Sequence, residues 1–583
     1  MARKLLVPCA LVLAAALITA SYRPALQGSW LLWDDASYVY RNRLVVQLRW
    51  PQKLRAAFTS FQCSNYHPLT MLSHAAVWHI AGPEATAHRA VNLVLHLLNA
   101  LLVYVLIRRL NGSRPIALAA ALLFGLHPMN VSVVAWVAER KELLATGFVL
   151  LAVLGWLAVA RRRHPYHAAA AYVLVLAAAT AALLSKPTAV TLPALLLAAT
   201  LTVTRTSRTP HTWLVLTILT FGAGALATLT WLAQRTTAIH DFPWFSRLCL
   251  MAHTLAWYFW HAVAPLGLSP HHPRYPHWML PDAHVAAGVA LLGAAVGIAV
   301  WSRRRVPAVA FGLVWFLLCW LPVSGAVPVG QAAVAERYLY LSQVGLLIAG
   351  FGAARSLATV ATEAAAPVRW SLSAVGLSGV IAVLSWWALE TQRYARVWAN
   401  EERLWKAVLH RYRDSGLAWV NLGAYYAQVK GDRDAAAACL AAAVATKTDG
   451  QQKLAGMNLL LLRLQDQPED PGLLWELERL LDEPPKRDNR LVRKAIVRAR
   501  AVAARAALSR RHPQAALRHA ERGLRFGPDD PELLYLAGAS LSALGRAEEA
   551  SQQFTQLLNG SNVPAKLRQA ARQQLASLRR TLR

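Results

Sequence analysis

Residues 115–160 read PIALAAALLFGLHPMNVSVVAWVAERKELLATGFVLLAVLGWLAVA. The stretch contains two apolar runs, 115–137 and 143–160, which are separated by a charged cluster at 139–142. Each run is close to the ~20 residues that a helix needs to cross a bilayer core of about 30 Å. Only helices and closed barrels satisfy their backbone hydrogen bonds in lipid, so runs of this length predict membrane helices.

The same pattern recurs along the first two thirds of the chain. Hydrophobic residues make up 56% of the sequence, which holds 22 tryptophans and has a positive mean hydropathy. This apolar share exceeds that of an ordinary soluble domain. We therefore expect an all-α, polytopic membrane domain of about 11–13 helices over residues 1–390. The expected spans lie near 5–21, 86–107, 115–137, 143–160, 167–184, 188–204, 212–233, 248–266, 284–301, 306–325, 336–354 and 369–389.

Basic residues in short loops predict the orientation of these spans. Lys and Arg outnumber Asp and Glu by 29 to 10 in residues 1–390, so the positive-inside rule accounts for the charge and nucleic acid need not be invoked. The loops expected in the cytoplasm contain Arg3-Lys4, Arg108-Arg109-Arg114, Arg161-Arg162-Arg163, Arg205-Arg208, Arg303-Arg304-Arg305 and Arg355-Arg369. The first loop, 22–85, then faces outward, and its part 45–84 is polar enough to predict interfacial helices.

Two segments need separate interpretation. Strict alternation of the spans fails at 248–266, which we expect to be re-entrant or displaced. The first span follows a basic start and ends near small residues, as a secretory signal does. An uncleaved first helix is the simpler prediction, because many further spans follow it.

The pattern changes beyond residue 390. Trp419, Leu422, Gly423 and Tyr426 reproduce the W-x2-L-G-x2-Y opening of a tetratricopeptide repeat. Ala516 and Ala550 are separated by one 34-residue period of such repeats. Residues 391–583 are therefore predicted to form a tetratricopeptide-repeat α-solenoid. Lys and Arg outnumber Asp and Glu there by 32 to 20, which suits an anionic lipid or polymer.

Two adjacent carboxylates, Asp34 and Asp35, directly follow the first apolar span. Carboxylates at the mouth of a membrane protein are seldom placed there for stability. One of them can act as general base on an incoming hydroxyl if the fold shapes its pKa and brings an electrophile within reach. Asp34 and Asp35 are therefore the candidate catalytic residues.

Three further charged clusters are expected at the outward ends of the spans, facing the same side as the acidic pair. They are Glu139-Arg140-Lys141-Glu142, Ser185-Lys186-Pro187 and Glu336-Arg337. Each could be an interfacial anchor whose charged head reaches water. Their convergence on one face favours a second interpretation, in which Arg and Lys bind a phosphate on a lipid headgroup.

Histidines and cysteines carry less information. The positions considered for a metal site are His67, His74, His88, His96, His127, His271 and His272. Most precede a proline or lie inside apolar helices, so packing is the commoner outcome and we predict no metal site. The five cysteines are scattered singly, which predicts no disulfide framework, and a phosphate-binding glycine loop is absent from the sequence.

These motifs occur in a fixed order. They read WDD at 33–35, YHPLT at 66–70, HRAVNLVLH at 88–96, LFGLHP at 123–128, AWVAERKELL at 135–144, SKP at 185–187 and ERYLYL at 336–341. This order, followed by the repeats, resembles the bacterial relatives of the transmembrane and tetratricopeptide-repeat O-mannosyltransferases over nearly the whole chain.

The resemblance implies a C-type glycosyltransferase that needs no metal and takes sugar from a polyprenyl-phosphate donor on the outer face. Asp34 or Asp35 is then the implied base. The implied donor-phosphate ligands are Arg140, Lys141, Lys186 and Arg337, with Glu139, Glu336, His67 and His127 in support. This chain has Ser132 where the relatives usually have Glu, and Pro187 where eukaryotic members tend to have an acidic residue.

The resulting hypothesis is a glycosyltransferase of the bacterial inner membrane, with its site and repeats on the periplasmic side. It would transfer a sugar, mannose by resemblance, to a Ser or Thr hydroxyl of a protein that the repeats hold. The alternative is a non-enzymatic scaffold whose repeats bind partner proteins. A transporter or flippase of lipid-linked sugar would need charged residues deep in the spans, which are nearly absent from the sequence.

Overall fold

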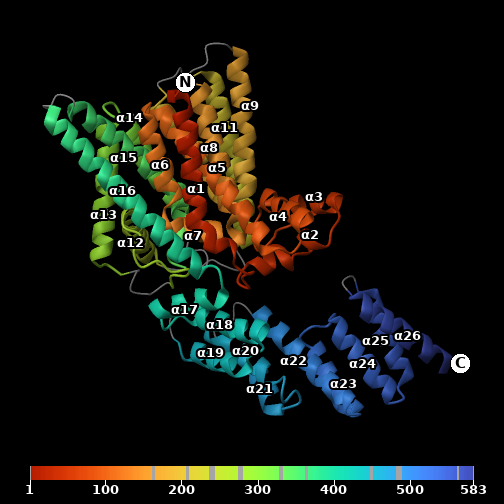
Figure 1. The fold of residues 1–583 in the computed structure, drawn as a ribbon. Coiled ribbons are helices and arrows are strands. Elements are labelled where there is room, and N and C mark those ends of the chain that lie inside the picture. The colour runs from red at the N-terminus through yellow and green to blue at the C-terminus, as the bar shows by residue number, and fades with distance from the viewer. Residues whose placement is uncertain are drawn as a thin grey trace. The chain divides into compact units, whose positions relative to one another are not determined.

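The computed structural model describes residues 2–159, 165–204, 209–234, 243–273, 280–326, 332–361, 366–446, 451–480, 489–560 and 563–581. Its elements in these ranges are helical (Figure 1). The chain divides into two compact units, Met1–Arg413 and Asp414–Arg583, here called the N-terminal unit and the C-terminal unit. The expected boundary after residue 390 lies within a helix that continues to Val397.

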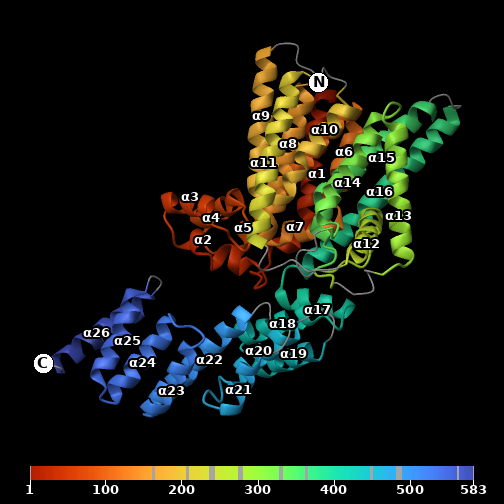
Figure 2. The same cartoon turned by 180° about the vertical axis from the view of Figure 1, so that it is seen from behind.

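The N-terminal unit is a bundle of long helices that lie side by side in two opposite views (Figures 1 and 2). Its elements are α1 (Ala2–Leu26), η1 (Ala36–Tyr40), α2 (Arg43–Val46), α3 (Trp50–Thr59), α4 (Pro68–Ala81), α5 (Ala85–Asn111), α6 (Arg114–Gly125), η2 (Pro128–Asn130), α7 (Val131–Ala135), η3 (Val137–Glu139), α8 (Arg140–Val159), α9 (Pro165–Ser185), η4 (Pro187–Thr191), α10 (Leu192–Thr202), α11 (Pro210–Gln234), α12 (Trp244–Val263), α13 (Ala283–Ser302), α14 (Pro307–Trp320), η6 (Leu321–Val323), η7 (Glu336–Tyr338), α15 (Leu339–Ala361), α16 (Ala366–Val397) and α17 (Glu401–Arg411).

Seven helices of the described residues are long and apolar enough to cross a membrane. They are Val7–Leu26, Ala85–Leu110, Val137–Val159, Ala168–Ser185, Pro210–Ala233, Ala283–Ser302 and Glu336–Ala358, and each overlaps an expected span. The expected spans 188–204 and 306–325 correspond to shorter apolar helices. The spans expected at 248–266 and 369–389 fall on α12 and α16, so the full count of about a dozen crossings stays a prediction.

The expected span 115–137 is not one straight helix. It is bent by 51° between α6 and α7. The cause is Pro128, which lacks an N–H and disfavours helical geometry at the preceding residue. His127 accordingly has an extended backbone, with ψ at 122°. The Asn130 side chain donates to the carbonyl of Phe124 at 2.7 Å, so the break leaves that carbonyl paired.

The polar stretch expected to form interfacial helices is helical, as predicted. It contains α2, α3 and α4, which lie beside one end of the bundle (Figures 1 and 2). α4 packs on α5 and α9, and α3 presents exposed Trp50 and Phe58. The orientation of the bundle stays a prediction. Two of the loops on which it depends, at 161–163 and 205–208, lie outside the described residues.

The C-terminal unit consists of consecutive short helices that pack mainly on their neighbours in sequence (Figure 1). They are α18 (Gly416–Tyr425), η8 (Tyr426–Lys430), α19 (Arg433–Ala445), α20 (Gln452–Arg463), α21 (Pro471–Arg479), α22 (Asn489–Ser509), α23 (Pro513–Leu524), α24 (Pro531–Ala543), α25 (Ala547–Asn559) and α26 (Ala565–Thr581). Gly423 lies against Leu440, and Gly538 against Phe554, where a Cβ would come within 3.1 and 2.8 Å. Assignment of these helices to tetratricopeptide repeats stays a prediction.

Close helix contacts in the N-terminal unit give a stability prediction. A Cβ at Gly345 of α15 would come within 2.5 Å of the Gly312 carbonyl oxygen of α14, whereas a Cβ at Gly350 would meet no atom within 4 Å. Overpacking typically costs about 1–3 kcal/mol. We therefore expect Gly345→Val to lower the thermal unfolding temperature in detergent. Gly350→Val, on the same helix, is the matched control, and an equal loss in both variants would contradict the contact.

Candidate functional site

Asp35 anchors the loop that follows α1. Its side chain is fully buried and accepts backbone N–H groups from Leu31 at 3.2 Å and Ala138 at 3.1 Å. Burial raises the pKa of Asp35 to about 7, against the opposing charge of Arg89. Both oxygens of Asp35 are thus engaged, and the residue fixes its neighbour Asp34 relative to η3.

Asp34 has a different environment, although it is the adjacent residue. Its side chain is half-buried, and the charges of Lys141, Glu139 and Arg337 all act on it. Burial raises the pKa of Asp34 above its ordinary value, and Lys141 is the main opposing charge. Within the described part of the chain, no hydrogen bond or ion pair to its carboxylate is formed. Asp34 is therefore the carboxylate of the pair that can accept a proton from another molecule.

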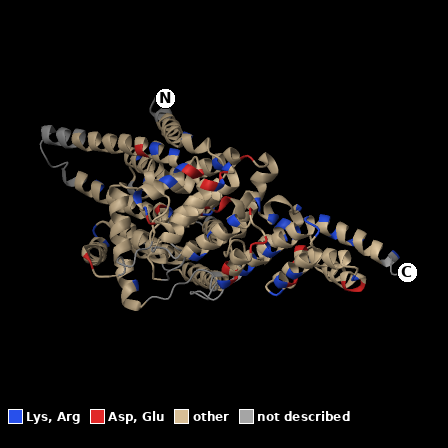
Figure 3. Cartoon of the chain, turned by 90° about the horizontal axis from the view of Figure 1, so that it is seen from below, with Lys and Arg blue, Asp and Glu red and all other residues tan. Residues whose placement is uncertain are grey.

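Glu139 gathers the cationic side chains. Its Oε1 lies 3.3 Å from Lys141 Nζ and 3.3 Å from Arg337 Nε, and its Oε2 lies 3.8 Å from Lys186 Nζ. Lys186 also pairs with Glu142. These cations come from three separate elements, the start of α8, the residue before η4, and η7. The three clusters expected on one face therefore meet. Over the whole described chain, Lys and Arg lie among Asp and Glu (Figure 3).

Aromatic rings line the same cations. Lys141 donates to the Tyr38 hydroxyl at 3.2 Å and lies 4.5 Å from the centre of that ring. The Arg337 guanidinium lies 5.2 Å from the ring centre of Trp136 and 4.9 Å from that of Tyr338. Such stacking holds cations in place while leaving donors for a ligand. The Nη groups of Arg337 form no hydrogen bond with another described residue, so a planar anion could accept hydrogen bonds from them.

Arg140 takes a structural position. It is fully buried, and it donates to the side-chain oxygen of Asn92 at 2.9 Å and to the carbonyls of Ser73 at 3.2 Å and His88 at 2.8 Å. These bonds tie the start of α8 to α4 and α5. The structure therefore places Arg140 beside the cation cluster but engages it in holding helices together, which disfavours its predicted role as a phosphate ligand.

Glu336 likewise faces away from the cluster. One carboxylate oxygen accepts the Ser269 N–H and the other accepts the Tyr394 hydroxyl, each at 2.7 Å. His272 Nε2 lies 3.6 Å from the same carboxylate. Glu336 thus connects the loop after α12 to α16. These two hydrogen bonds also fix the position of η7, which contains Arg337.

The two histidines predicted to support the site are not placed together. His67 stacks on Tyr38 with ring centroids 5.4 Å apart, and burial, aided by Lys141, lowers the pKa of His67 to about 3. Its ring is therefore neutral beside the cluster. His127 instead accepts the Met129 N–H at 3.3 Å and interacts with the Ala262 carbonyl at 3.2 Å. Its role is to stabilise the break after α6.

Sequence reasoning missed Tyr38, Trp136 and Tyr338 as site residues. Trp136 and Tyr338 lie inside motifs that the sequence analysis names, and Tyr38 lies three residues after another, so their spacing offered a signal. Tyr38 is four residues after Asp34, which is one helical turn, and its N–H bonds the Asp34 carbonyl at 3.0 Å. Ser132, which replaces the usual glutamate, is buried and donates to the Met129 carbonyl at 3.2 Å.

An apolar groove begins one turn beyond Lys186. Its volume is about 570 Å³, and it lies between η4, α10 and α11. Lining residues include Val190, Pro193, Leu197, Leu216 and Phe221. Phe221 is exposed on a helix that qualifies as a membrane span, so the groove opens where lipid would be.

Comparison with known proteins supports a mannosyltransferase-type domain in this unit. Residues 67–233 match the family model described as dolichyl-phosphate-mannose-protein mannosyltransferase. The matched range includes Glu139, Lys141, Lys186 and the apolar groove, whereas Asp34 and Arg337 lie outside it. Together with the seven apolar helices, this match supports an integral membrane protein.

Individual relatives agree with the family match. The chain is 34% identical over 128 residues to the protein O-mannosyl-transferase Tmtc1 of Drosophila melanogaster, covering 22% of this chain and 14% of the relative. It is 31% identical over 158 residues to the protein O-mannosyl-transferase TMTC1 of Homo sapiens, covering 24% of this chain and 18% of the relative. The chain thus aligns with less than a fifth of the length of these relatives.

Proposed function

We propose that this protein is a membrane glycosyltransferase that moves mannose from a polyprenyl-phosphate donor to a Ser or Thr hydroxyl of a protein. The observation that carries the proposal is the meeting of Lys141, Lys186 and Arg337 on Glu139, with Asp34 beside them. Cations for a phosphate and a carboxylate for a hydroxyl proton are the two groups that this transfer needs.

The donor would be held at its two chemically different ends. Arg337 offers a planar fork to the phosphate, and Lys141 and Lys186 offer point charges. The groove beside η4 is apolar and suits the prenyl chain, because it begins close to Lys186. Glu139 would position the three cations without contacting the sugar. Mannose, rather than another sugar, is proposed from the similarity to the mannosyltransferase family.

The transfer step uses one base and one leaving group. The acceptor oxygen forms a bond with the anomeric carbon while the bond between that carbon and the phosphate oxygen breaks. The hydroxyl proton passes to the Asp34 carboxylate, and the polyprenyl phosphate leaves with the electron pair. Lys141, Lys186 and Arg337 stabilise the charge that develops on the leaving phosphate.

The two ends of α5 support a proposal for the side of the membrane. Arg89 near its start contacts the loop that carries Asp34, since it donates to the Ser29 carbonyl at 2.6 Å. Arg108 near its end is close to Arg355 across Gly112, where a Cβ would come within 3.9 and 3.2 Å of their guanidinium nitrogens. At about 1.5 Å per residue these ends are roughly 28 Å apart. The basic end suits the cytoplasm, which supports the proposal that the site faces the periplasm of a bacterial inner membrane.

The C-terminal unit is proposed to bind the protein acceptor. Its stacked helices suit an extended binding surface if they are tetratricopeptide repeats. The unit lies on the same chain as the proposed site, and α16 and α17 lead into it directly. Peptide binding without sugar transfer would instead match the scaffold alternative.

A transfer assay tests the proposed function. Membranes that contain the protein are incubated with labelled polyprenyl-phosphate mannose, and with the matched glucose donor as a control. We expect label to appear in protein and to be released by alkaline β-elimination, which cleaves O-linked sugars from Ser and Thr. Empty-vector membranes measure the background labelling of protein. If membranes with the protein give no more labelled protein than this background from either donor, enzymatic transfer is contradicted.

A further inference from the structure

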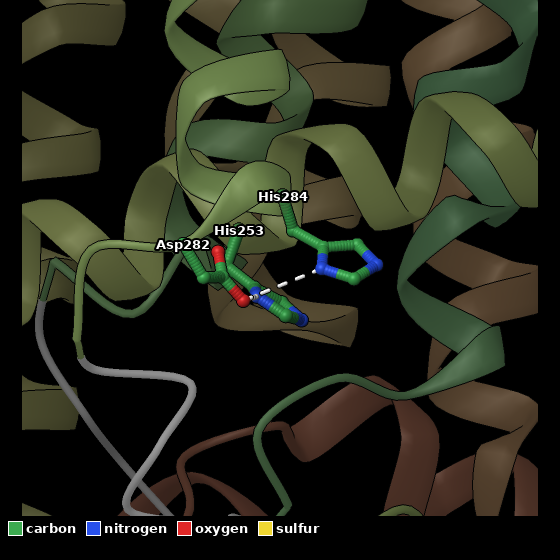
Figure 4. A group of neighbouring side chains, drawn as sticks. All are labelled: His253, Asp282 and His284. Atoms are coloured by element: carbon green, nitrogen blue, oxygen red, sulfur yellow. Dashed lines mark hydrogen bonds and ion pairs between the residues drawn. The ribbon is translucent and has the colours of Figure 1, made fainter.

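Three potential metal ligands, from the middle of α12 and the start of α13, converge (Figure 4). His253 lies on α12, Asp282 directly precedes α13, and His284 is in the first turn of α13. Their side chains point toward one another, and one potential ligand atom from each lies within 4.8 Å of the others. None of these histidines was among the metal candidates of the sequence, because 29 residues separate Asp282 from His253 along the chain.

Two of the three separations between the potential ligand atoms are close to those around a bound ion. Asp282 Oδ2 lies 3.3 Å from His284 Nδ1 and 3.9 Å from His253 Nδ1. Zinc bonds of ~2.1 Å at tetrahedral angles place ligand atoms about 3.4 Å apart. The His284 side chain is 70% exposed, so its ring can turn toward His253 and shorten a separation of up to 4.8 Å by as much as about 1.4 Å. The His253 side chain is only 5% exposed and provides the fixed member of the set.

Two features of the packing preorganise these ligands. Asp282 caps α13 by accepting the Val285 N–H at 2.8 Å through Oδ1, which leaves Oδ2 directed at the histidines. One turn later, Gly288 lies directly on the backbone of Ala252, and any Cβ there would overlap its carbonyl group. Because Ala252 precedes His253, this backbone contact sets the distance between the two helices at the ligands. Supporting interactions of this kind orient the ligands of metal sites.

We propose that His253, Asp282 and His284 bind a zinc ion, with solvent completing its coordination. Two imidazoles and a carboxylate favour a first-row transition ion over Mg²⁺ or Ca²⁺, which prefer oxygen ligands. The exposed His284 side chain leaves that side of the site uncovered by the described residues, so an ion can enter and keep water ligands. The site is distinct from the cluster at Glu139 and requires no role for the metal in sugar transfer.

The ion would link His253, in the middle of α12, to the start of α13, on the two sides of the connection between these helices. The described part of this connection contains Ser269, which donates to Glu336 beside Arg337. It also contains His272, which interacts with the Tyr412 hydroxyl at 2.8 Å. Bound zinc would therefore restrict the motion of a segment that contacts Glu336, the neighbour of Arg337. We expect zinc to raise the stability of the protein.

Zinc titration of the full-length protein tests this site. Tag-free protein in detergent is stripped with a chelator and titrated with Zn²⁺ by calorimetry, and with Co²⁺ while its visible absorption is recorded. We expect one ion per chain, and a tetrahedral or five-coordinate Co²⁺ spectrum. Loss of a supporting residue alone weakens metal sites by about 10- to 100-fold. His253→Ala and His284→Ala should therefore weaken binding by at least ~100-fold.

Matched variants separate the site from surface binding. His211→Ala removes an exposed histidine from the first turn of another apolar helix, α11, and should leave affinity unchanged. Asp282→Asn keeps an oxygen for the helix cap and should still weaken zinc binding. Equal metal-free unfolding temperatures show that the variants are folded. The proposal is overturned if the wild type binds no zinc, or if binding persists in His253→Ala and His284→Ala.

Discussion

Replacing Asp34 with asparagine is expected to lower sugar transfer by about 10²- to 10⁴-fold, the range that general-base help contributes. The substitution keeps the size of the side chain and removes its ability to take the hydroxyl proton. Asp34 is half-buried, and its carboxylate bonds no other described residue, so the fold should be unaffected. Initial rates with labelled donor and a peptide acceptor, normalised to folded protein, measure the effect.

The neighbouring carboxylate supplies the control. Asp35→Asn can still accept one of the N–H groups of Leu31 and Ala138, but its amide nitrogen faces the other. A buried donor without a partner costs about 1–3 kcal/mol, so this variant should lose stability. Per folded molecule, the transfer rate of Asp35→Asn should be much higher than that of Asp34→Asn. The reverse order of activities would assign the base to Asp35.

The pH dependence of transfer gives an independent readout. The base must be deprotonated, so the rate should fall as pH decreases through the pKa of Asp34. Burial raises that pKa above the ordinary 3.8, and the charges of Lys141 and Arg337 oppose the increase. The acid limb of the rate profile should therefore lie at higher pH than for an exposed aspartate. In Asp34→Asn the transfer rate should be low and should no longer fall with decreasing pH in this range.

The positions of adjacent charged residues show where sequence reasoning reached its limit. Arg140 and Lys141 share one motif, yet successive residues of a helix point about 100° apart. Arg140 therefore turns toward Asn92 on α5, while Lys141 turns toward Tyr38. The motif located the cluster, but which of two neighbours faces a ligand depends on the elements packed around it.

Packing also decides the roles of Asp34 and Asp35 and the course of the helices. Order and hydropathy predicted the seven apolar helices and the meeting of the three charged clusters. They did not indicate that Asp35 accepts two backbone N–H groups, because one of them, from Ala138, is about a hundred residues away. Contacts of that separation follow from packing. The bend at Pro128 was foreseeable from the chemistry of proline, although the apolar run concealed it.

Donor binding should depend on Arg337 and not on Arg140. Arg337→Gln removes a charged fork whose Nε lies 3.3 Å from Glu139 and whose guanidinium lies 5.2 Å from the ring centre of Trp136 and 4.9 Å from that of Tyr338. A hydrogen bond to a charged group contributes about 1.5–3 kcal/mol. We therefore expect the Kd for polyprenyl-phosphate mannose to rise about 10- to 150-fold, with any acceptor or none.

Arg140→Gln provides the comparison, because it removes an arginine from the adjacent cluster position. Its guanidinium is fully buried and bonds Asn92, Ser73 and His88, so its loss should lower the unfolding temperature in detergent. Donor affinity of the protein that remains folded should change little. Fluorescence quenching of the tryptophans by donor, measured for both variants, decides between the two arginines. If Arg140→Gln abolishes donor binding at full stability and Arg337→Gln binds normally, the phosphate lies deeper, between α4, α5 and α8, and the cluster at Glu139 serves another purpose.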